Sequence, residues 1–294
     1  MKVGSPEHRD LFCSAFIAGY RAYEPEQLAW PIVEPKYLER LRAIPFWGVA
    51  KAMERKAGIM VTAFGKTLED PVIREAVLLQ GAEETRHARL ITYFIDRYGL
   101  PARQIDTPDL LPARKEDFVV FGYEECVDFF MGAGLFRLAS QLDVFPADLV
   151  SIFEHIIFEE ARHVTFFINW FRYEEARAGR DGVVSRHLVA LKNYARSIKQ
   201  LVRSFAGEET TGFAAVNAKD LIEGMTPMMF LEAALAENRL LLGRLDRRLL
   251  KPSLLPGLAL TMLTALRALP PRPVATERAV PDNSRRSLDS SIAA

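Results

Sequence analysis

The feature that most constrains the fold is a five-residue pattern, Glu-Glu-x-Arg-His, that occurs twice in the sequence. The first copy ends at His87 and the second at His163. Residues three positions apart in an α-helix lie on one face, about one turn apart. Glu84 and His87 therefore share a face, as do Glu160 and His163. Each pair can reach one metal ion from a single helix, so the pattern predicts two helices that meet at a metal site.

Both pairs interrupt helical stripes that are otherwise apolar. The stripes comprise Val77, Gly81, Ala88, Ile91 and Phe94 in the first helix and Phe153, Ile156, Ile157, Val164, Phe167 and Trp170 in the second. A charged group that faces a core is costly unless it is paired or coordinated. Two helices with the same costly pattern indicate a shared metal site. The alternative interpretation is a pair of core histidines that flanking salt bridges satisfy.

Composition excludes several classes of function. The chain has 294 residues and no net formal charge, so no strong field attracts nucleic acid and we expect no nucleic-acid partner. Its only cysteines, Cys13 and Cys126, form neither a disulfide framework nor a Cys-x-x-Cys metal site. The N-terminus lacks a signal-peptide pattern, and no apolar run reaches the length of a membrane span. We therefore expect a cytoplasmic protein.

The periodicity of the chain predicts helices throughout and no strands. Asp70 followed by Pro71 is typical of a helix start, and Gly99 is typical of a helix end. Four helices of a central bundle are expected at about 45–64, 71–98, 116–141 and 146–179. Two further amphipathic helices are expected at about 183–205 and 218–250. The sequence thus predicts an all-α fold.

These helices suggest a division of the chain into four parts. We expect a helical lead-in, a four-helix core, C-terminal helices packed on the core and a flexible tail, at 1–45, 46–180, 181–269 and 270–294. The apolar segment 254–269 can dock on the bundle, at an oligomer interface or on a membrane surface, and we favour docking on the bundle.

In helical bundles, two helices of this kind form a di-metal site together with one carboxylate from each of two further helices, so two more carboxylates are expected. Glu54 is the only carboxylate on the inward stripe of the first long helix, and its spacing from Glu84 fits an antiparallel hairpin with both residues at one level. The third long helix is ambiguous, because Glu125 and Asp128 lie within one turn. We favour Glu125 because its stripe is the more apolar. Asp128 stays as the alternative ligand.

The complete pattern resembles the ferritin-like diiron carboxylate superfamily over roughly residues 45–180, through Glu54, Glu84-x-x-His87, Glu125 and Glu160-x-x-His163. The doubled motif is especially similar to the hydroxylase subunits of soluble methane and toluene monooxygenases. The resemblance implies a ferritin-like four-helix bundle with additional N- and C-terminal helices. It implies two iron ions held by these six residues, and manganese in one or both positions also fits. By the same resemblance, Glu83 would orient His163 and Glu159 would orient His87.

The expected activity is that of a non-haem diiron oxygenase or oxidase. Such an enzyme uses O₂ to hydroxylate, desaturate, cleave or N-oxygenate a mostly apolar small organic substrate. A separate reductase or ferredoxin would supply electrons, and a homodimer is one assembly that we consider. We expect apolar walls and small residues beside the metals, from Phe121, Phe129, Ile156, Phe167, Ile91, Ala57, Gly58, Gly81, Gly122 and Gly132. The alternative is a ferritin-like iron-binding or ferroxidase protein.

Overall fold

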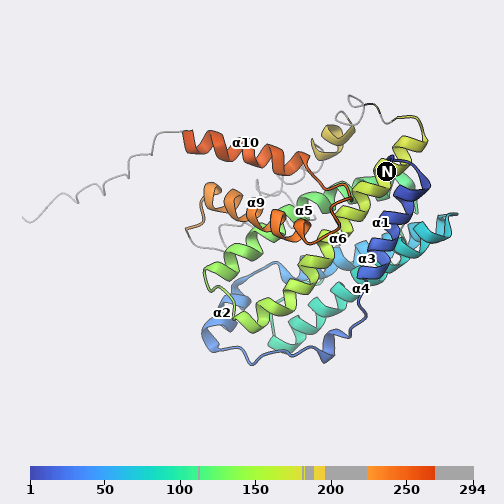
Figure 1. The fold of residues 1–294 in the computed structure, drawn as a ribbon. Coiled ribbons are helices and arrows are strands. Elements are labelled where there is room, and N and C mark those ends of the chain that lie inside the picture. Colours follow the sequence, from blue (N-terminus) through green and yellow to red (C-terminus); the bar gives the residue numbers. More distant parts are fainter. Residues whose placement is uncertain (112, 181, 183–188, 196–223, 269–294) are drawn as a thin grey trace, which may run out of the picture.

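Every regular element in the described part of the chain is a helix (Figure 1). The computed structural model describes residues 1–111, 113–180, 182, 189–195 and 224–268. The all-α prediction is confirmed for these residues. Four long helices form the centre of the protein, namely α3 (Trp47–Thr67), α4 (Pro71–Tyr98), α5 (Lys115–Gln141) and α6 (Ala147–Arg177). Their bounds lie within a few residues of those that the sequence predicts.

The ends of α4 show how local sequence sets the length of a helix. The side chain of Asp70 accepts hydrogen bonds from the backbone N–H groups of Val72 and Ile73, at 3.0 and 3.1 Å. This satisfies two of the N–H groups that a helix start leaves unpaired. At the other end, Gly99 adopts the left-handed conformation with φ 56°, which suits glycine and stops the helix. The glutamates and the histidine of the first motif consequently lie in the middle of α4.

Helices α3 and α4 form a tight antiparallel hairpin. A Cβ atom on Gly58 would lie 2.6 Å from Oγ1 of Thr85, and a Cβ atom on Gly81 would overlap Oγ1 of Thr62. These glycines permit the close approach that brings Glu54 beside the motif in α4. The expectation that Gly58 and Gly81 leave room for a substrate is therefore wrong, because the neighbouring helix fills that space.

Aromatic side chains fill one half of the helical core. The rings of Phe64 and Phe118 stack with their centroids 4.4 Å apart, and Trp170 packs edge-on against both. A Cβ atom on Gly122 would overlap the ring of Phe167, which is fully buried in the same cluster. Gly122 is thus a third glycine, after Gly58 and Gly81, beside which packing fills the space that was expected for a substrate.

The remaining helices cover the four long ones. They are α1 (Pro6–Gly19), the short 3-10 helix η1 (Pro25–Gln27), α2 (Pro35–Ala43), α9 (Pro227–Gly243) and α10 (Leu254–Ala268). Helix α1 packs on α4 and α6, whereas α9 packs on α5 and carries α10 (Figure 1). The helix expected at 218–250 is shorter, because α9 begins after the capping side chain of Thr226. Most of the helix expected at 183–205, and the tail 270–294, lie outside the described residues.

Helix α10 docks on the protein, as the sequence analysis favours. It buries Ala259 and Leu263 against Phe130 of α5 and Leu231 of α9. None of the helices in the described ranges combines the length and the apolarity that crossing a bilayer requires.

The packing at Gly122 generates a prediction about stability. Gly122→Ala should lower the free energy of unfolding by about 1–3 kcal/mol, because the added methyl group overpacks the core against Phe167. Gly243→Ala is the matched control, since a Cβ atom there meets no atom within 4 Å. It should be neutral or slightly stabilising. Urea denaturation of both variants provides the measurement, and equal midpoints would contradict the proposed role of Gly122.

Candidate metal centre

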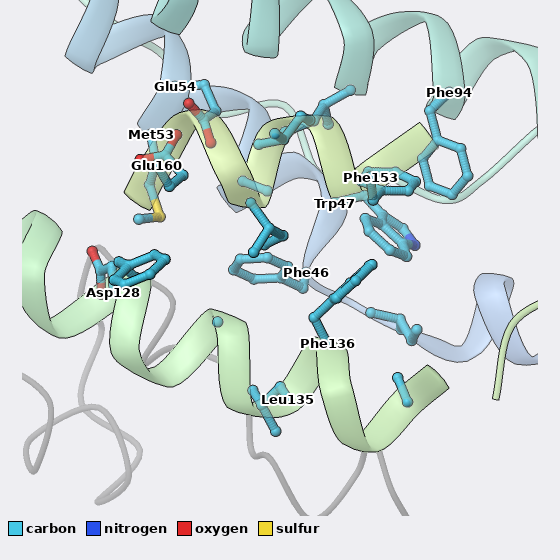
Figure 2. A pocket seen from close by; sticks show the side chains of 18 of the residues that line it. Phe46, Trp47, Met53, Glu54, Phe94, Asp128, Leu135, Phe136, Phe153 and Glu160 are labelled. Atoms are coloured by element: carbon cyan, nitrogen blue, oxygen red, sulfur yellow. The ribbon is translucent and has the colours of Figure 1, made fainter. Parts of the chain in front are cut away.

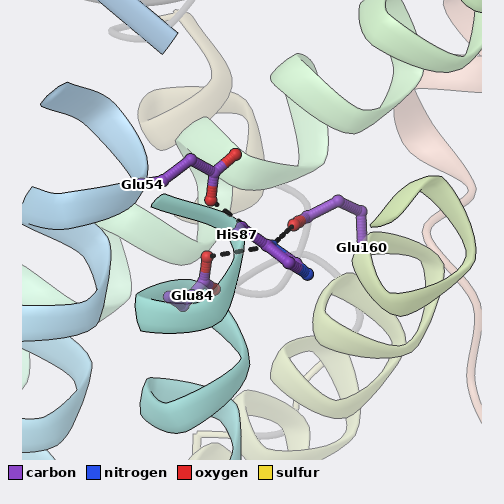
Figure 3. Close-up of side chains that lie close together, drawn as sticks. All are labelled: Glu54, Glu84, His87 and Glu160. Atoms are coloured by element: carbon purple, nitrogen blue, oxygen red, sulfur yellow. Dashed lines mark ion pairs between the residues drawn. The ribbon is translucent and has the colours of Figure 1, made fainter. Parts of the chain in front are cut away.

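Four side chains from three helices converge at the middle of the core (Figure 3). Glu54 comes from α3, Glu84 and His87 come from α4, and Glu160 comes from α6. One oxygen or nitrogen atom from each lies within 4.8 Å of those from the others, which is close enough for all four to hold one metal ion. His163 adjoins this group, with its Nδ1 atom 3.1 Å from Oε1 of Glu84 and 3.3 Å from Oε2 of Glu160. Five of the six predicted ligands are thus adjacent.

The Nδ1 atoms of both histidines are surrounded by carboxylate oxygens. Nδ1 of His87 lies 3.0 Å from Oε1 of Glu160 and 3.4 Å from Oε2 of Glu54. Nevertheless, neither this atom nor Nδ1 of His163 makes a hydrogen bond of acceptable geometry within the described part of the chain. Buried polar atoms are normally paired. Here the imidazole nitrogens and carboxylate oxygens converge on one point without hydrogen bonding to each other. Ligand atoms around a metal ion have this arrangement.

The opposite nitrogen of His87 is fixed by a carboxylate from the other motif. Nε2 of His87 lies 2.8 Å from Oε2 of Glu159, and Oε1 of Glu159 accepts a hydrogen bond of 2.7 Å from Arg86. A carboxylate accepts, so Nε2 carries the hydrogen atom of this bond. Nδ1 is then the nitrogen that faces the carboxylate cluster, and its lone pair becomes available to a metal ion once the proton that the carboxylates favour there is displaced.

The second motif repeats this arrangement in the opposite direction. Nε2 of His163 lies 2.8 Å from Oε2 of Glu83, and Arg162 donates to Oε1 of Glu83 at 2.8 Å. Each helix therefore lends one glutamate to the histidine and arginine of the other. These are the hydrogen bonds that the family resemblance implies. We call the two sets of contacts the crossed pairs.

The segment at the N-terminus supports the crossed pairs, a role that none of the sequence motifs indicates. The guanidinium group of Arg86 lies over the ring of Tyr23, 4.2 Å from its centroid. Arg162 lies over Phe16, 4.5 Å from the ring centroid, and donates a hydrogen bond to its carbonyl oxygen. Aromatic residues in the lead-in are the only sequence signal for these contacts. Gln80 was also missed, although its position one turn before Glu84 places its amide 3.3 Å from that carboxylate.

Electrostatics at the centre favour binding of a cation. Burial raises the pKa of Glu54 to about 8, and it raises the pKa of Glu125 well above its usual range, with the charge of Glu160 adding to the effect. Burial acts to lower the pKa of His87 and of His163, but the surrounding carboxylates outweigh it and raise both pKa values. The cluster therefore retains protons at neutral pH in the absence of a metal. A metal ion must displace them, so its affinity rises with pH.

Glu125 and Asp128 both line a cavity beside Glu54 and Glu160. Charges on Glu160, Glu84 and Glu54 all contribute to the raised pKa of Glu125. Of these three groups, only Glu160 acts on the pKa of Asp128. Glu125 thus feels the charges of three predicted ligands and Asp128 that of one, and the assignment of Glu125 as the sixth ligand stays a prediction.

The cavity has a volume of about 210 Å³ and extends from the carboxylates to one end of the four long helices (Figure 2). Its walls are otherwise apolar, and they include Phe46, Trp47, Phe94, Phe129, Leu135, Phe136, Phe153 and Ile156. Ile91, Ala57 and Gly132 also line it, as predicted. Phe121 and Phe167 do not belong to the lining, because they pack in the aromatic half of the core.

The remaining histidine of α6 lies outside the centre. His155 is exposed, and its Nδ1 atom lies 3.0 Å from the carbonyl oxygen of Ser151 on its own helix. His155 lies five residues before Glu160, which places it about 140° around an ideal helix from that ligand. This angle directs its side chain away from the centre.

Comparison with known proteins gives no match, whether with protein-family models, with curated proteins or with solved structures. The site must therefore be interpreted from its own geometry.

The crossed pairs generate a prediction about metal affinity. Glu83→Ala removes the acceptor that orients His163 and pairs with Arg162, so metal affinity should fall by about 10–100-fold. His155→Ala, the control, should bind metal as the wild-type protein does. Competition titration with a chromophoric chelator measures both. An unchanged affinity for Glu83→Ala, or an equal loss for His155→Ala, would contradict this description of the site.

Proposed function

We propose that this protein is a ferritin-like, non-haem diiron oxygenase or oxidase. Two iron ions would be held by Glu54, Glu84, His87, Glu125, Glu160 and His163. The observation that carries the proposal is the position of the ligand cluster at the inner end of an apolar cavity. A metal centre beside an apolar cavity suits the oxidation of an organic molecule.

Charge and ligand type support two divalent ions. Four carboxylates offset the charge of two such ions, and the imidazoles of His87 and His163 complete the set. Carboxylate and imidazole ligands suit iron and manganese, so mixed occupancy fits the same residues. Two Fe(II) ions in this site would supply electrons to O₂ and thereby allow oxidation of a bound substrate.

The protein's own side chains have three tasks in this proposal. Glu83 and Glu159 hold the two imidazoles in the orientation that leaves Nδ1 free for a metal. The aromatic and aliphatic walls exclude water from the reacting groups. They also select a mostly apolar small molecule, which would undergo hydroxylation, desaturation, carbon–carbon cleavage or N-oxygenation. The sequence carries no flavin or nicotinamide fingerprint, so the proposal assigns electron supply to a separate reductase or ferredoxin.

The proposal is tested by O₂ consumption with the full chain. Protein loaded with Fe(II) under anaerobic conditions should bind two ions per chain. When it is mixed with O₂, a reductant and a panel of apolar acids, amines and aldehydes, O₂ uptake should continue through many turnovers and depend on one class of compound. Glu84→Ala should abolish both metal binding and turnover, whereas His155→Ala should retain them. Iron that is oxidised once and then accumulates as mineral, without organic product, would instead support the ferroxidase alternative.

A further inference from the structure

One carboxylate in the cavity is not used by the proposed metal centre. Asp128 lies at the same end of the cavity as Glu54, Glu160 and Met53 (Figure 2). It makes no hydrogen bond or ion pair within the part of the chain that the structure describes. The rest of the lining beyond this end is apolar. An acidic group that faces an apolar cavity without a protein partner is an unusual and costly arrangement.

Asp128 is poorly suited to serve as an additional metal ligand. Glu54, Glu84, Glu125 and Glu160 already balance the charge of two divalent ions. A fifth carboxylate would leave an excess negative charge in a buried site, which is unfavourable. Asp128 also lies three residues beyond Glu125 on α5, about 4.5 Å further along the helix axis. Asp128 is therefore displaced from Glu125 along the helix, although both line the cavity.

The cost of this charge falls if a bound molecule supplies the opposite charge. Burial, with the charges of Glu124 and Glu160, raises the pKa of Asp128 to about 7. A ligand with an ammonium group would form a charge-assisted hydrogen bond with the carboxylate, which is about twice as strong as a neutral one. Within the cavity lining, the other acidic groups are the proposed metal ligands, whose charge the metals offset.

We propose that Asp128 binds the protonated amino group of a substrate whose remaining body is apolar. This inference rests on the proposed function and specifies its substrate class. The body of the substrate would lie against the aromatic side chains at the other end of the cavity, which include Phe46, Trp47, Phe94, Phe136 and Phe153 (Figure 2). The cavity of about 210 Å³ is larger than one of about 150 Å³ that accommodates benzene. It therefore has room for an aromatic ring with a short aminoalkyl chain.

The test compares two probes of nearly equal shape, 2-phenylethylamine and 2-phenylethanol. Only the amine is charged at pH 7.5, because alkylammonium groups have pKa values of about 10. Binding is measured by calorimetry on the full chain loaded with Mn(II), which avoids turnover. The wild-type protein should bind the amine at least tenfold more tightly than the alcohol. Asp128→Asn should remove this preference while retaining the metal, and Asp128→Glu should keep the preference.

Glu116→Gln is the matched control, since it removes an exposed carboxylate from the same helix and should leave the preference unchanged. Equal affinities of the wild-type protein for both probes would overturn the inference, and this comparison requires no variant. A preference that survives Asp128→Asn would also overturn it, because the amine would then bind elsewhere. Metal loss from Asp128→Asn would make Asp128 a ligand and overturn the inference while leaving the proposed function intact. If the protein takes up no metal, the proposed function is contradicted, and the same comparison on the metal-free chain tests the inference separately, because only a preference that Asp128→Asn removes would support it.

Discussion

The crossed pairs between α4 and α6 are the interaction on which the rest of the structure depends. Each buried glutamate of these pairs accepts from a histidine and an arginine of the opposite helix. Removing one partner of a buried ion pair costs about 3–5 kcal/mol, because the remaining charge stays buried. A shift of either helix along its axis would break both sets of bonds. The pairs thus fix the register of the two helices that carry the histidines.

The fixed register separates two kinds of packing around the centre. On one side, rings such as Phe118 and Trp170 pack against each other and fill the core. On the other side, the start of α3 and the end of α5 line a cavity that also contains the carboxylates. The filled aromatic side keeps the ligands in precise positions, and the cavity on the other side gives a small molecule access to them. The proposed function depends on having both beside the same centre.

The sequence predicted the centre better than its surroundings, for physical reasons. Glu84-x-x-His87 is a local pattern on one helix, and the cap at Asp70 is equally local, so both were readable from sequence. The crossing of Glu83 to His163 followed from a family resemblance. The support from Phe16 and Tyr23 depends on how the chain folds back over α4 and α6, which periodicity does not encode. Likewise, the role of Gly58 depends on the opposing Thr85, so a small residue that suggested space proved to be a site of close contact.

The most direct test of the account is a crystal structure of the iron-loaded protein with anomalous diffraction data collected above and below the iron absorption edge. Our account predicts two iron peaks between α4 and α6, one bound by Nδ1 of His87 and the other by Nδ1 of His163. Carboxylates of Glu84 and Glu160 should lie beside both peaks. A protein that takes up iron elsewhere, or that shows no iron peak between these helices, would contradict the central claim.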